Sequence, residues 1–469
     1  MLVNRPSGVL RARGSASDGP GGPDGAAAQG RARRIAGAAL PLCLTMIASS
    51  AASVVDTAVL GRHGTGPLAA FAVTMAVFGP AAAAVSGAMR GVMPFVSEHR
   101  DDPDRLLPVL RNGMWLGILV GVPGAVAVAA VPVIGRAGGV PESTLRELGA
   151  FPCLLAGAVV VMSVGATATS ALVGLGRSRA VLRSGMAGTV AAVVLSLVLV
   201  GGAGSFDGLG LPGAGVAMLV SAAVNASLAH RLLRRSTVLA GRRPGLGRPR
   251  PREVLRLAGI GIPLAATVLI KFAVLGVLAF SAARIGTDSA AVHSIALSLV
   301  NPVFTAAVAV GQATVPLMAD PVRRGDVAEI RRTASAGVGV ALGAVAALAG
   351  LLVLAGGPVI SVFTHDPGLR GRLLELLPLV LLTVVADAVQ AVLGFGLVGI
   401  RRTLPSLAVF AVCYGLLALA AVPVAAAGGL AGLWLALAGA NLLLAAGQAY
   451  FFRSCSGSLA AADPVRVNA

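Results

Sequence analysis

The chain has 469 residues, of which 56% are hydrophobic and only 12% are charged. A soluble domain carries about 25% charged residues, so this composition argues against a soluble enzyme, and the apolar content excludes a disordered chain. The formal net charge of +18 would by itself favour a nucleic-acid partner, and its meaning depends on where the charges lie.

Residues 1–34 are polar, basic and rich in Gly, Pro and Ala, and they contain no apolar segment typical of a signal peptide. We expect a disordered cytoplasmic tail here. From residue 35 the chain becomes a series of apolar runs, each long enough to cross a bilayer as a helix. The twelve predicted membrane helices lie at about 35–60, 67–90, 109–134, 148–174, 184–203, 213–233, 257–280, 288–317, 334–357, 373–398, 405–426 and 430–452.

The longest basic stretch lies between the sixth and the seventh of these helices, and its Pro and Gly residues prevent a continuous helix. It divides the chain into an N-terminal six-helix lobe at 35–233, a basic cytoplasmic linker at 234–256 and a C-terminal six-helix lobe at 257–452. A cytoplasmic tail is expected at 453–469.

The basic residues gather on one side of the predicted membrane. If the N-terminus is cytoplasmic, the loops and helix ends on the cytoplasmic side hold 26 basic residues, Arg90 among them, and the outer side holds six. Cytoplasmic loops carry such an excess, so the sequence predicts a multi-pass protein of the bacterial inner membrane with both termini in the cytoplasm. The net charge therefore reflects topology, and we expect no nucleic-acid partner.

The two halves of the chain repeat each other at an offset of 222 residues. The motif R-x-G-T at 62–65 then coincides with the same motif at 284–287, and three prolines, including Pro41, coincide with three others, including Pro263. Six helices separate the copies, so both have the same membrane orientation, as in parallel repeats related by an axis along the membrane normal. The predicted fold is an all-α integral membrane protein with twelve transmembrane helices in two six-helix lobes related by this parallel internal repeat.

Residues 40–73, with the run VVDTAVLGRHG, resemble the first-helix region of multidrug and toxic compound extrusion (MATE) transporters, most closely the DNA-damage-inducible F branch. Residues 257–320 resemble the matching segment of the second lobe. The resemblance implies a monomeric antiporter, without cofactor, that exports small organic and often cationic compounds in exchange for protons or sodium ions. It also implies that Asp56 is the residue that couples transport to the ion.

The fifth helix departs from the family pattern. Related members often carry an Asn and an Asp four residues apart there, whereas this chain has Ala192 and Ser196. A sodium site in the first lobe would then lack two ligands. This favours protonation of Asp56 alone, and it also leaves open a protein that has lost ion coupling.

Two further charges lie near the middle of predicted helices, where isolated charges are costly. Lys271 and Asp387 are each about fourteen residues into helices that run in opposite directions, so they lie at a similar depth. We predict a salt bridge between them, with Gln390 one turn from Asp387 on the same helix face. In some relatives acids on these two helices form a cation site, so the resemblance implies that Lys271 replaces a bound ion. A purely structural pair is an equal alternative.

The remaining polar residues within the predicted helices are weaker candidates. Asn225, Asn301 and Asn441 could line a cavity or join adjacent helices, and His293 could carry a proton or lie at the interface. Pro41 and Pro263 break helical hydrogen bonds and are predicted to act as hinges. No metal site, catalytic motif or nucleotide-binding motif occurs, so we do not expect an enzyme or an ATP-driven pump.

The favoured function is a secondary active antiporter that exports amphipathic organic compounds by alternating access, driven by proton influx and less by sodium. One alternative is a lipid-linked sugar flippase of the same superfamily, although such flippases often have fourteen helices. Another is a degenerate membrane protein that transports nothing. Cavities for bulky apolar molecules leave no sequence motif, so the sequence does not identify the substrate.

Overall fold

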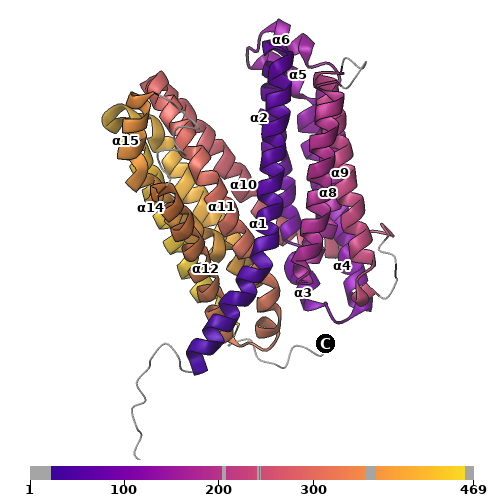
Figure 1. Cartoon of the computed structure of the whole chain (residues 1–469). Coiled ribbons are helices and arrows are strands. Elements are labelled where there is room, and N and C mark those ends of the chain that lie inside the picture. The colour runs from indigo at the N-terminus through magenta and orange to yellow at the C-terminus, as the bar shows by residue number, and fades with distance from the viewer. Residues whose placement is uncertain (1–22, 203–207, 240–241, 243–244, 355–365, 460–469) are drawn as a thin grey trace, which may run out of the picture.

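The computed structural model describes residues 23–202, 208–239, 242, 245–354 and 366–459, and nearly all of these residues are helical (Figure 1). In the N-terminal half the helices are α1 (Pro23–His63), α2 (Thr65–Arg90), α3 (Met93–Glu98), α4 (Pro103–Ala129), α5 (Val131–Ala137), α6 (Glu142–Glu147), α7 (Phe151–Gly174), α8 (Ser178–Leu199) and α9 (Leu211–Arg234). The C-terminal half contains α10 (Pro251–Ile285), α11 (Thr287–Arg323), α12 (Val327–Leu354), α14 (Pro367–Gly399) and α15 (Leu404–Gly457).

Eleven helices of the described part are long and apolar enough to cross a membrane, and α15, with 54 residues, contains two of the predicted spans. Its backbone leaves the helical region at Gly429, where φ is 57° and ψ is −150°. The Tyr414 hydroxyl donates to Asn441 Oδ1 at 2.8 Å, and Gln448 Nε2 donates to Ser406 Oγ at 3.0 Å. Both pairs are centred close to Gly429, so the two parts of α15 form an antiparallel hairpin. The twelve predicted membrane helices are therefore present.

Four boundaries differ from the expectation. At the C-terminus, α15 continues to Gly457, so residues 453–457 are helical rather than part of the expected tail at 453–469, and residues 460–469 lie outside the described residues. Residues 23–34 are the first turns of α1 rather than part of a disordered tail, because the segment is rich in alanine and Arg31 is held by Glu329 at 3.3 Å. Residues 1–22 lie outside the described residues. The third membrane helix ends at Ala129, and a separate helix with Pro132 in its first turn follows it. The linker after α9 is shorter than expected, since α10 begins at Pro251.

The described end of the linker is fixed to the N-terminal half. Trp115 Nε1, on α4, donates to the Leu246 carbonyl oxygen at 3.0 Å, and Asn112 Oδ1 accepts from the Arg250 N–H at 3.1 Å. These bonds place the start of α10 against α4, so the linker positions the second half on the first.

The internal repeat is visible in the backbone. Gly64 and Gly286, at the predicted offset, join the first two helices of each half with nearly the same conformation: φ is 133° at Gly64 and 154° at Gly286. Glycine is required there because side chains disfavour positive φ. The packing repeats as well, since α1 packs on α8 as α10 packs on α15, and α2 packs on α7 as α11 packs on α14.

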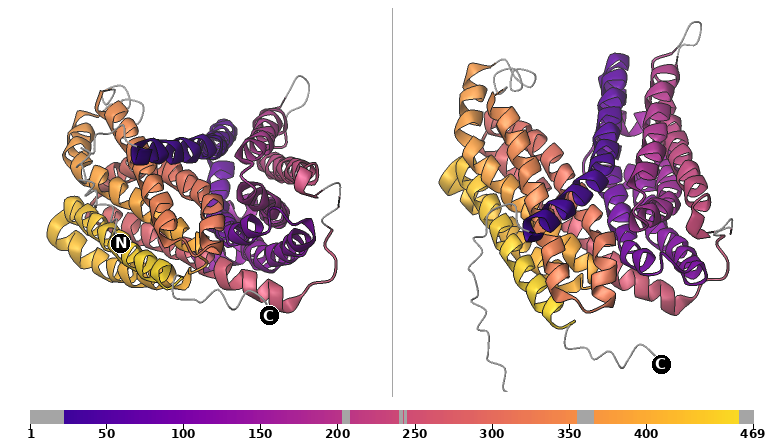
Figure 2. Two further views of the ribbon diagram at one scale, coloured as in Figure 1. Left: turned by 90° about the horizontal axis from the view of Figure 1, so that it is seen from below. Right: turned by 60° about the horizontal axis from the view of Figure 1, so that its bottom comes forward.

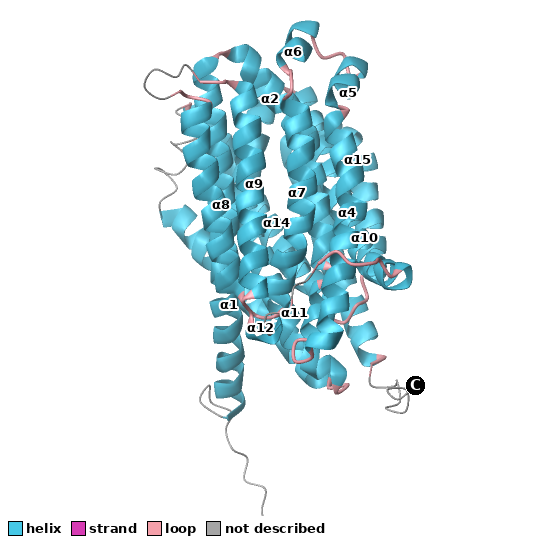
Figure 3. Ribbon diagram, turned by 90° about the vertical axis from the view of Figure 1, so that its right-hand side faces the viewer, coloured by secondary structure: helices cyan, strands magenta, loops and turns pink. Residues whose placement is uncertain are grey.

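The two halves meet through equivalent helices: α1 packs against α11, and α2 packs against α10. In Figure 1 the halves lie close together at the lower end, where α1 crosses from one half towards the other, and they diverge towards the upper end. Figure 2 shows this lower end from below and tilted forward, and Figure 3 shows the helices of the N-terminal half side by side. The lower end carries Arg31, Arg100, Arg177, Arg324 and Arg401, and we call it the basic end.

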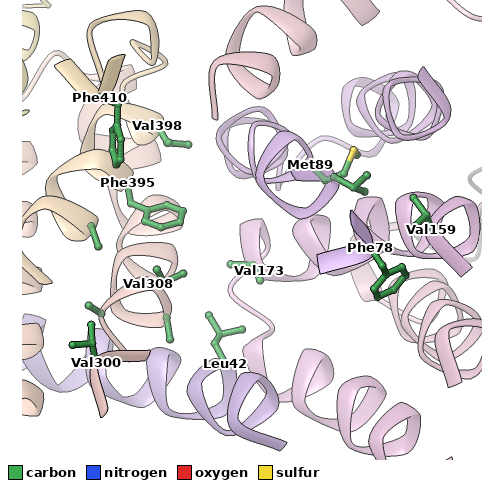
Figure 4. Close-up of a cluster of buried hydrophobic side chains, with 14 of the residues drawn as sticks. Leu42, Phe78, Met89, Val159, Val173, Val300, Val308, Phe395, Val398 and Phe410 are labelled. Atoms are coloured by element: carbon green, nitrogen blue, oxygen red, sulfur yellow. The ribbon is translucent and has the colours of Figure 1, made fainter. Parts of the chain in front are cut away.

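Each half has apolar side chains between its own helices. Phe395, Val398 and Phe410 lie on helices of the C-terminal half, whereas Phe78, Met89 and Val159 lie on those of the N-terminal half (Figure 4). Trp434 and Tyr414 are among the largest fully buried side chains. The polar groups described next are therefore held in two apolar bodies.

Candidate functional site

The predicted ion pair of Lys271 and Asp387 is present. Lys271 Nζ, on α10, lies 2.8 Å from Asp387 Oδ1 and 2.9 Å from Asp387 Oδ2, on α14. Gln390 Nε2 donates to Asp387 Oδ1 at 2.9 Å, and Lys271 Nζ lies 3.5 Å from the centroid of the Phe304 ring. The lysine thus occupies the place where a cation would bind both carboxylate oxygens, and its charge is balanced within the C-terminal half.

A cavity of about 90 Å³ opens beside this pair, between the two halves. Its lining includes Lys271 and Gln390, whereas Asp387 lies behind them and is only 3% exposed. The apolar part of the lining comes from the rings of Phe304, Phe395 and Phe410. The cavity is therefore mostly apolar, with a few polar groups that come from helices of both halves.

A second cavity, of about 250 Å³, lies mainly within the N-terminal half. Asn225 lines this cavity, which is one of its two predicted roles, the other being to join adjacent helices. Thr45, Thr169 and Gln312 supply further polar groups. The apolar residues of its lining include three methionines, whose flexible side chains adapt to different shapes. These methionines are Met46, Met93 and Met162.

The other polar candidates lie away from both cavities. Asn441 bonds to Tyr414 within the α15 hairpin, and His293 is buried against Trp434 with ring centroids 5.7 Å apart. Neither ring nitrogen of His293 has a hydrogen-bond partner among the described residues. Asn301 is exposed on α11. Asn441 therefore joins the two parts of α15 rather than lining a cavity. His293 is buried rather than exposed at the membrane interface.

Asp56 is buried on α1, with 5% of its surface exposed, and it lines neither cavity. On α8, which packs against α1, Ser196 is buried and its Oγ has no hydrogen-bond partner among the described residues. Ala192, one turn earlier on α8, is also buried. The departure noted on the fifth helix therefore lies on α8, the helix that packs against α1, which carries Asp56. The equivalent of Asp56 in the second half is Leu278.

Both predicted hinge prolines lie inside long helices, near the contact between the halves. Pro41 interrupts the hydrogen bonding of α1, and Thr45 Oγ1 donates to the Pro41 carbonyl oxygen at 2.8 Å. Pro263 lies in α10, two residues after Gly261, which packs against α2. Each proline removes one helical N–H donor and thereby weakens the helix locally, as a hinge would require.

One residue that the sequence analysis assigned to a helix end belongs to the site. Arg90, on α2, lines both cavities, and its guanidinium carbon lies 5.7 Å from the centroid of the Phe395 ring across the contact between the halves. The hydropathy pattern ends at Arg90, which explains the assignment. No local signal in the sequence separates Arg90 from a loop arginine, because it follows an apolar run and precedes a glycine.

Ion pairs join the halves at the basic end. Glu98, after α2, pairs with Arg401, after α14, and Arg100 Nη2 lies 2.5 Å from Asp320 Oδ2 on α11. The Arg401 guanidinium also lies 4.5 Å from the Phe95 ring centroid. In the described residues, every ion pair between the halves lies at this end. The cavities are thus closed on the basic side.

The comparisons agree with this architecture. The chain matches the family model described as MatE over residues 41–198 and 263–424, which is more than half of its length. A "Probable multidrug resistance protein NorM" of Aromatoleum aromaticum is 28% identical over 81% of this chain and 83% of the relative. A protein of the same description from Deinococcus radiodurans is also 28% identical, over 88% of this chain and 92% of its own length.

A solved structure described as the "outward-facing conformation of a multidrug resistance MATE family transporter of the MOP superfamily" is similar with a TM-score of 0.80. The likeness covers 92% of this chain and 96% of that one at 17% sequence identity, and it therefore concerns the fold. The relatives described above are named NorM, so the F branch stays a prediction.

Proposed function

Because the chain belongs to the MatE family, we propose that it is a secondary active transporter that exports amphipathic organic compounds by alternating access. The observation that carries the proposal is the pair of repeated halves, joined at the basic end, with cavities between and beside them that contain Arg90 and Lys271. Two related bodies that rock about a shared site are the usual basis of alternating access. The names of the NorM relatives support multidrug efflux.

We place the basic end in the cytoplasm of a bacterial inner membrane, because arginine-rich loops stay on the cytoplasmic side. The conformation is then outward-facing, since the halves are in contact at the basic end. Both termini are cytoplasmic in this orientation, and the chain acts as a monomer because each chain carries both halves of the site.

Proton influx through Asp56 is the proposed driving force. Asp56 is a buried carboxyl group in the half that lacks the second and third polar ligands of a sodium site, because Ala192 and Ser196 stand at those positions of α8. Protonation removes the free-energy cost of a charge in this apolar position. It therefore favours the conformation of the N-terminal half in which Asp56 is buried over the conformation in which it is accessible to water. The second half needs no coupling ion, because Lys271 already neutralises Asp387.

The test is export of fluorescent dyes from proteoliposomes with an imposed pH or sodium gradient. We expect the pH gradient to drive transport by the unmodified protein, and Asp56→Asn to abolish the dependence on the gradient. Asp288→Asn, at an exposed carboxylate near the same end, is the matched control and should behave as the unmodified protein. Gradient-driven export by Asp56→Asn would refute the coupling role, and a protein that moves no dye would instead favour the flippase or the inactive alternative.

A further inference from the structure

The charge balance of the two cavities is unusual for a site that takes cations. Among the described residues, Arg90 and Lys271 are the only charged ones in the lining of either cavity, and both are positive. Lys271 is neutralised by Asp387, which lies outside the lining. No Asp or Glu lines the cavities to attract a cation. The lining therefore carries the net positive charge of Arg90.

Arg90 has no hydrogen-bond or ion-pair partner in the described part of the chain. The one interaction given for its guanidinium is with the face of Phe395, at 5.7 Å from the ring centroid. The side chain is half-buried, because part of its surface faces the two cavities. No nitrogen of Arg90 is among the fully buried polar atoms without a partner in the described residues, so the guanidinium faces the cavities and is available to a counter-charge that arrives with a ligand.

We propose that the substrate is an amphipathic organic anion whose carboxylate or sulfonate group binds Arg90. This rests on the proposed export function and names its substrate class. A guanidinium binds such planar or multidentate anions through two parallel hydrogen bonds, which gives it both affinity and orientation. Ser406 lies in the same lining, and its hydroxyl accepts from Gln448 Nε2 and keeps its own proton to donate to an anion.

The apolar body of the anion fits the remaining surface. On one side of Arg90 the lining offers Phe304 and Phe410, and on the other side it offers Met46 and Met162. Neither cavity alone reaches the roughly 300 Å³ of a typical small-molecule site, and Arg90 lines both. A substrate held at its head group by Arg90 can therefore extend to either side. An anionic substrate differs from the often cationic substrates that the family resemblance implies.

The experiment uses two dyes with the same xanthene rings and opposite charge, the anion fluorescein and the cation rhodamine 6G. Binding to the purified protein is measured by fluorescence polarisation, without any gradient. We expect fluorescein to bind at least tenfold more tightly than rhodamine 6G, and Arg90→Gln to remove this preference. Arg90→Lys should retain part of it. Arg284→Gln, which removes an exposed arginine far from the cavities, should leave the preference unchanged.

Competition on the unmodified protein provides a second measurement that needs no variant. Octanoate should displace fluorescein, and octylamine should not. Equal or tighter binding of rhodamine 6G, no binding of fluorescein up to millimolar concentration, or an unchanged preference in a folded Arg90→Gln protein would each overturn the anion site. Displacement by phosphatidylglycerol but not by octanoate would identify a lipid head group and overturn a free organic anion. Fluorescein binding without gradient-driven movement in proteoliposomes would instead refute export and leave the anion site standing.

Discussion

The backbones of Gly91 and Gly261 are in direct contact between the two halves, so that a Cβ atom at position 91 would lie 2.7 Å from the Gly261 Cα. A Cβ at position 261 would lie 2.4 Å from the Ala88 carbonyl oxygen. The neighbouring atoms belong to backbone and cannot rotate away. This close approach of α2 and α10 closes the basic end, and small residues at such a contact are typical of membrane helices.

Gly91→Ala should therefore open the basic end. The methyl group cannot fit while the halves are closed, so the conformational equilibrium should move towards the state in which α2 and α10 are separated. Position 105 is exposed in the first turn of α4, and position 324 is exposed directly after α11. The distance between spin labels at these two positions should increase or become bimodal in a background without native cysteines.

The matched control is Gly259→Ala, on the same helix as Gly261. No atom lies within 4 Å of a Cβ there, so the spin-label distance should not change. If Gly91→Ala keeps the distance distribution of the parent protein, the glycine contact does not control closure.

The ion pair of Glu98 with Arg401 should stabilise the same closed state. Both side chains are about a quarter exposed, and partly exposed pairs contribute no more than about 1 kcal/mol, which corresponds to roughly a fivefold change in the open population. We expect Glu98→Arg to increase the open population and the swapped pair Glu98→Arg with Arg401→Glu to reverse much of the effect. The swap will not restore the arginine on Phe95, so full recovery is not expected.

Salt provides an independent check on that pair. Because screening weakens partly exposed charges, high ionic strength should reduce the difference between Glu98→Arg and the parent protein. A charge-swapped protein that remains as open as the single variant would show that Glu98 acts through another contact, such as His99, whose Nδ1 lies 3.5 Å away.

The sequence was sufficient for the features that depend on depth and periodicity. Residue counts along two antiparallel helices placed Lys271 and Asp387 at the same depth in the membrane. An unpaired buried charge is costly, so two opposite charges at one depth are expected to pair, as they do. The repeat at Gly64 and Gly286 was likewise visible, because a backbone that only glycine adopts leaves the same residue in both copies.

The features that depend on how the halves meet could not be predicted. Arg90 follows an apolar run and precedes a glycine, so along the chain it is indistinguishable from a loop arginine. Its place between two cavities arises from the crossing of α2 and α10, which brings together segments about 170 residues apart and has no local sequence pattern. Arg401 was similarly counted as topology, and it forms an ion pair with Glu98 between the halves.

The α15 hairpin provides a sharp test of backbone conformation. Gly429 has a positive φ of 57°, whereas the adjacent Gly428 does not, and a Cβ would meet no atom within 4 Å at either position. The ψ of −150° places Gly429 in a region that is essentially restricted to glycine, so Gly429→Ala should cost about 1–3 kcal/mol through backbone strain alone. Gly428→Ala should be neutral or slightly stabilising. A thermal unfolding series of both variants in detergent compares them directly, and equal midpoints would contradict the strained turn.

The pair of Lys271 and Asp387 should contribute to stability through charge balance rather than through packing. Lys271→Met retains most of the side-chain volume but leaves Asp387 buried without its partner, which typically costs about 3–5 kcal/mol. Lys271→Met combined with Asp387→Leu removes both charges and should recover most of the loss, although Gln390 then loses its acceptor. The exchanged pair, Lys271→Asp with Asp387→Lys, should also fold, but less stably than the parent protein because Lys271 alone lies over the Phe304 ring. Midpoints of thermal unfolding, followed by the fluorescence of the buried Trp434, measure all three variants. Double variants as unstable as Lys271→Met would show that the two residues do not act as a pair.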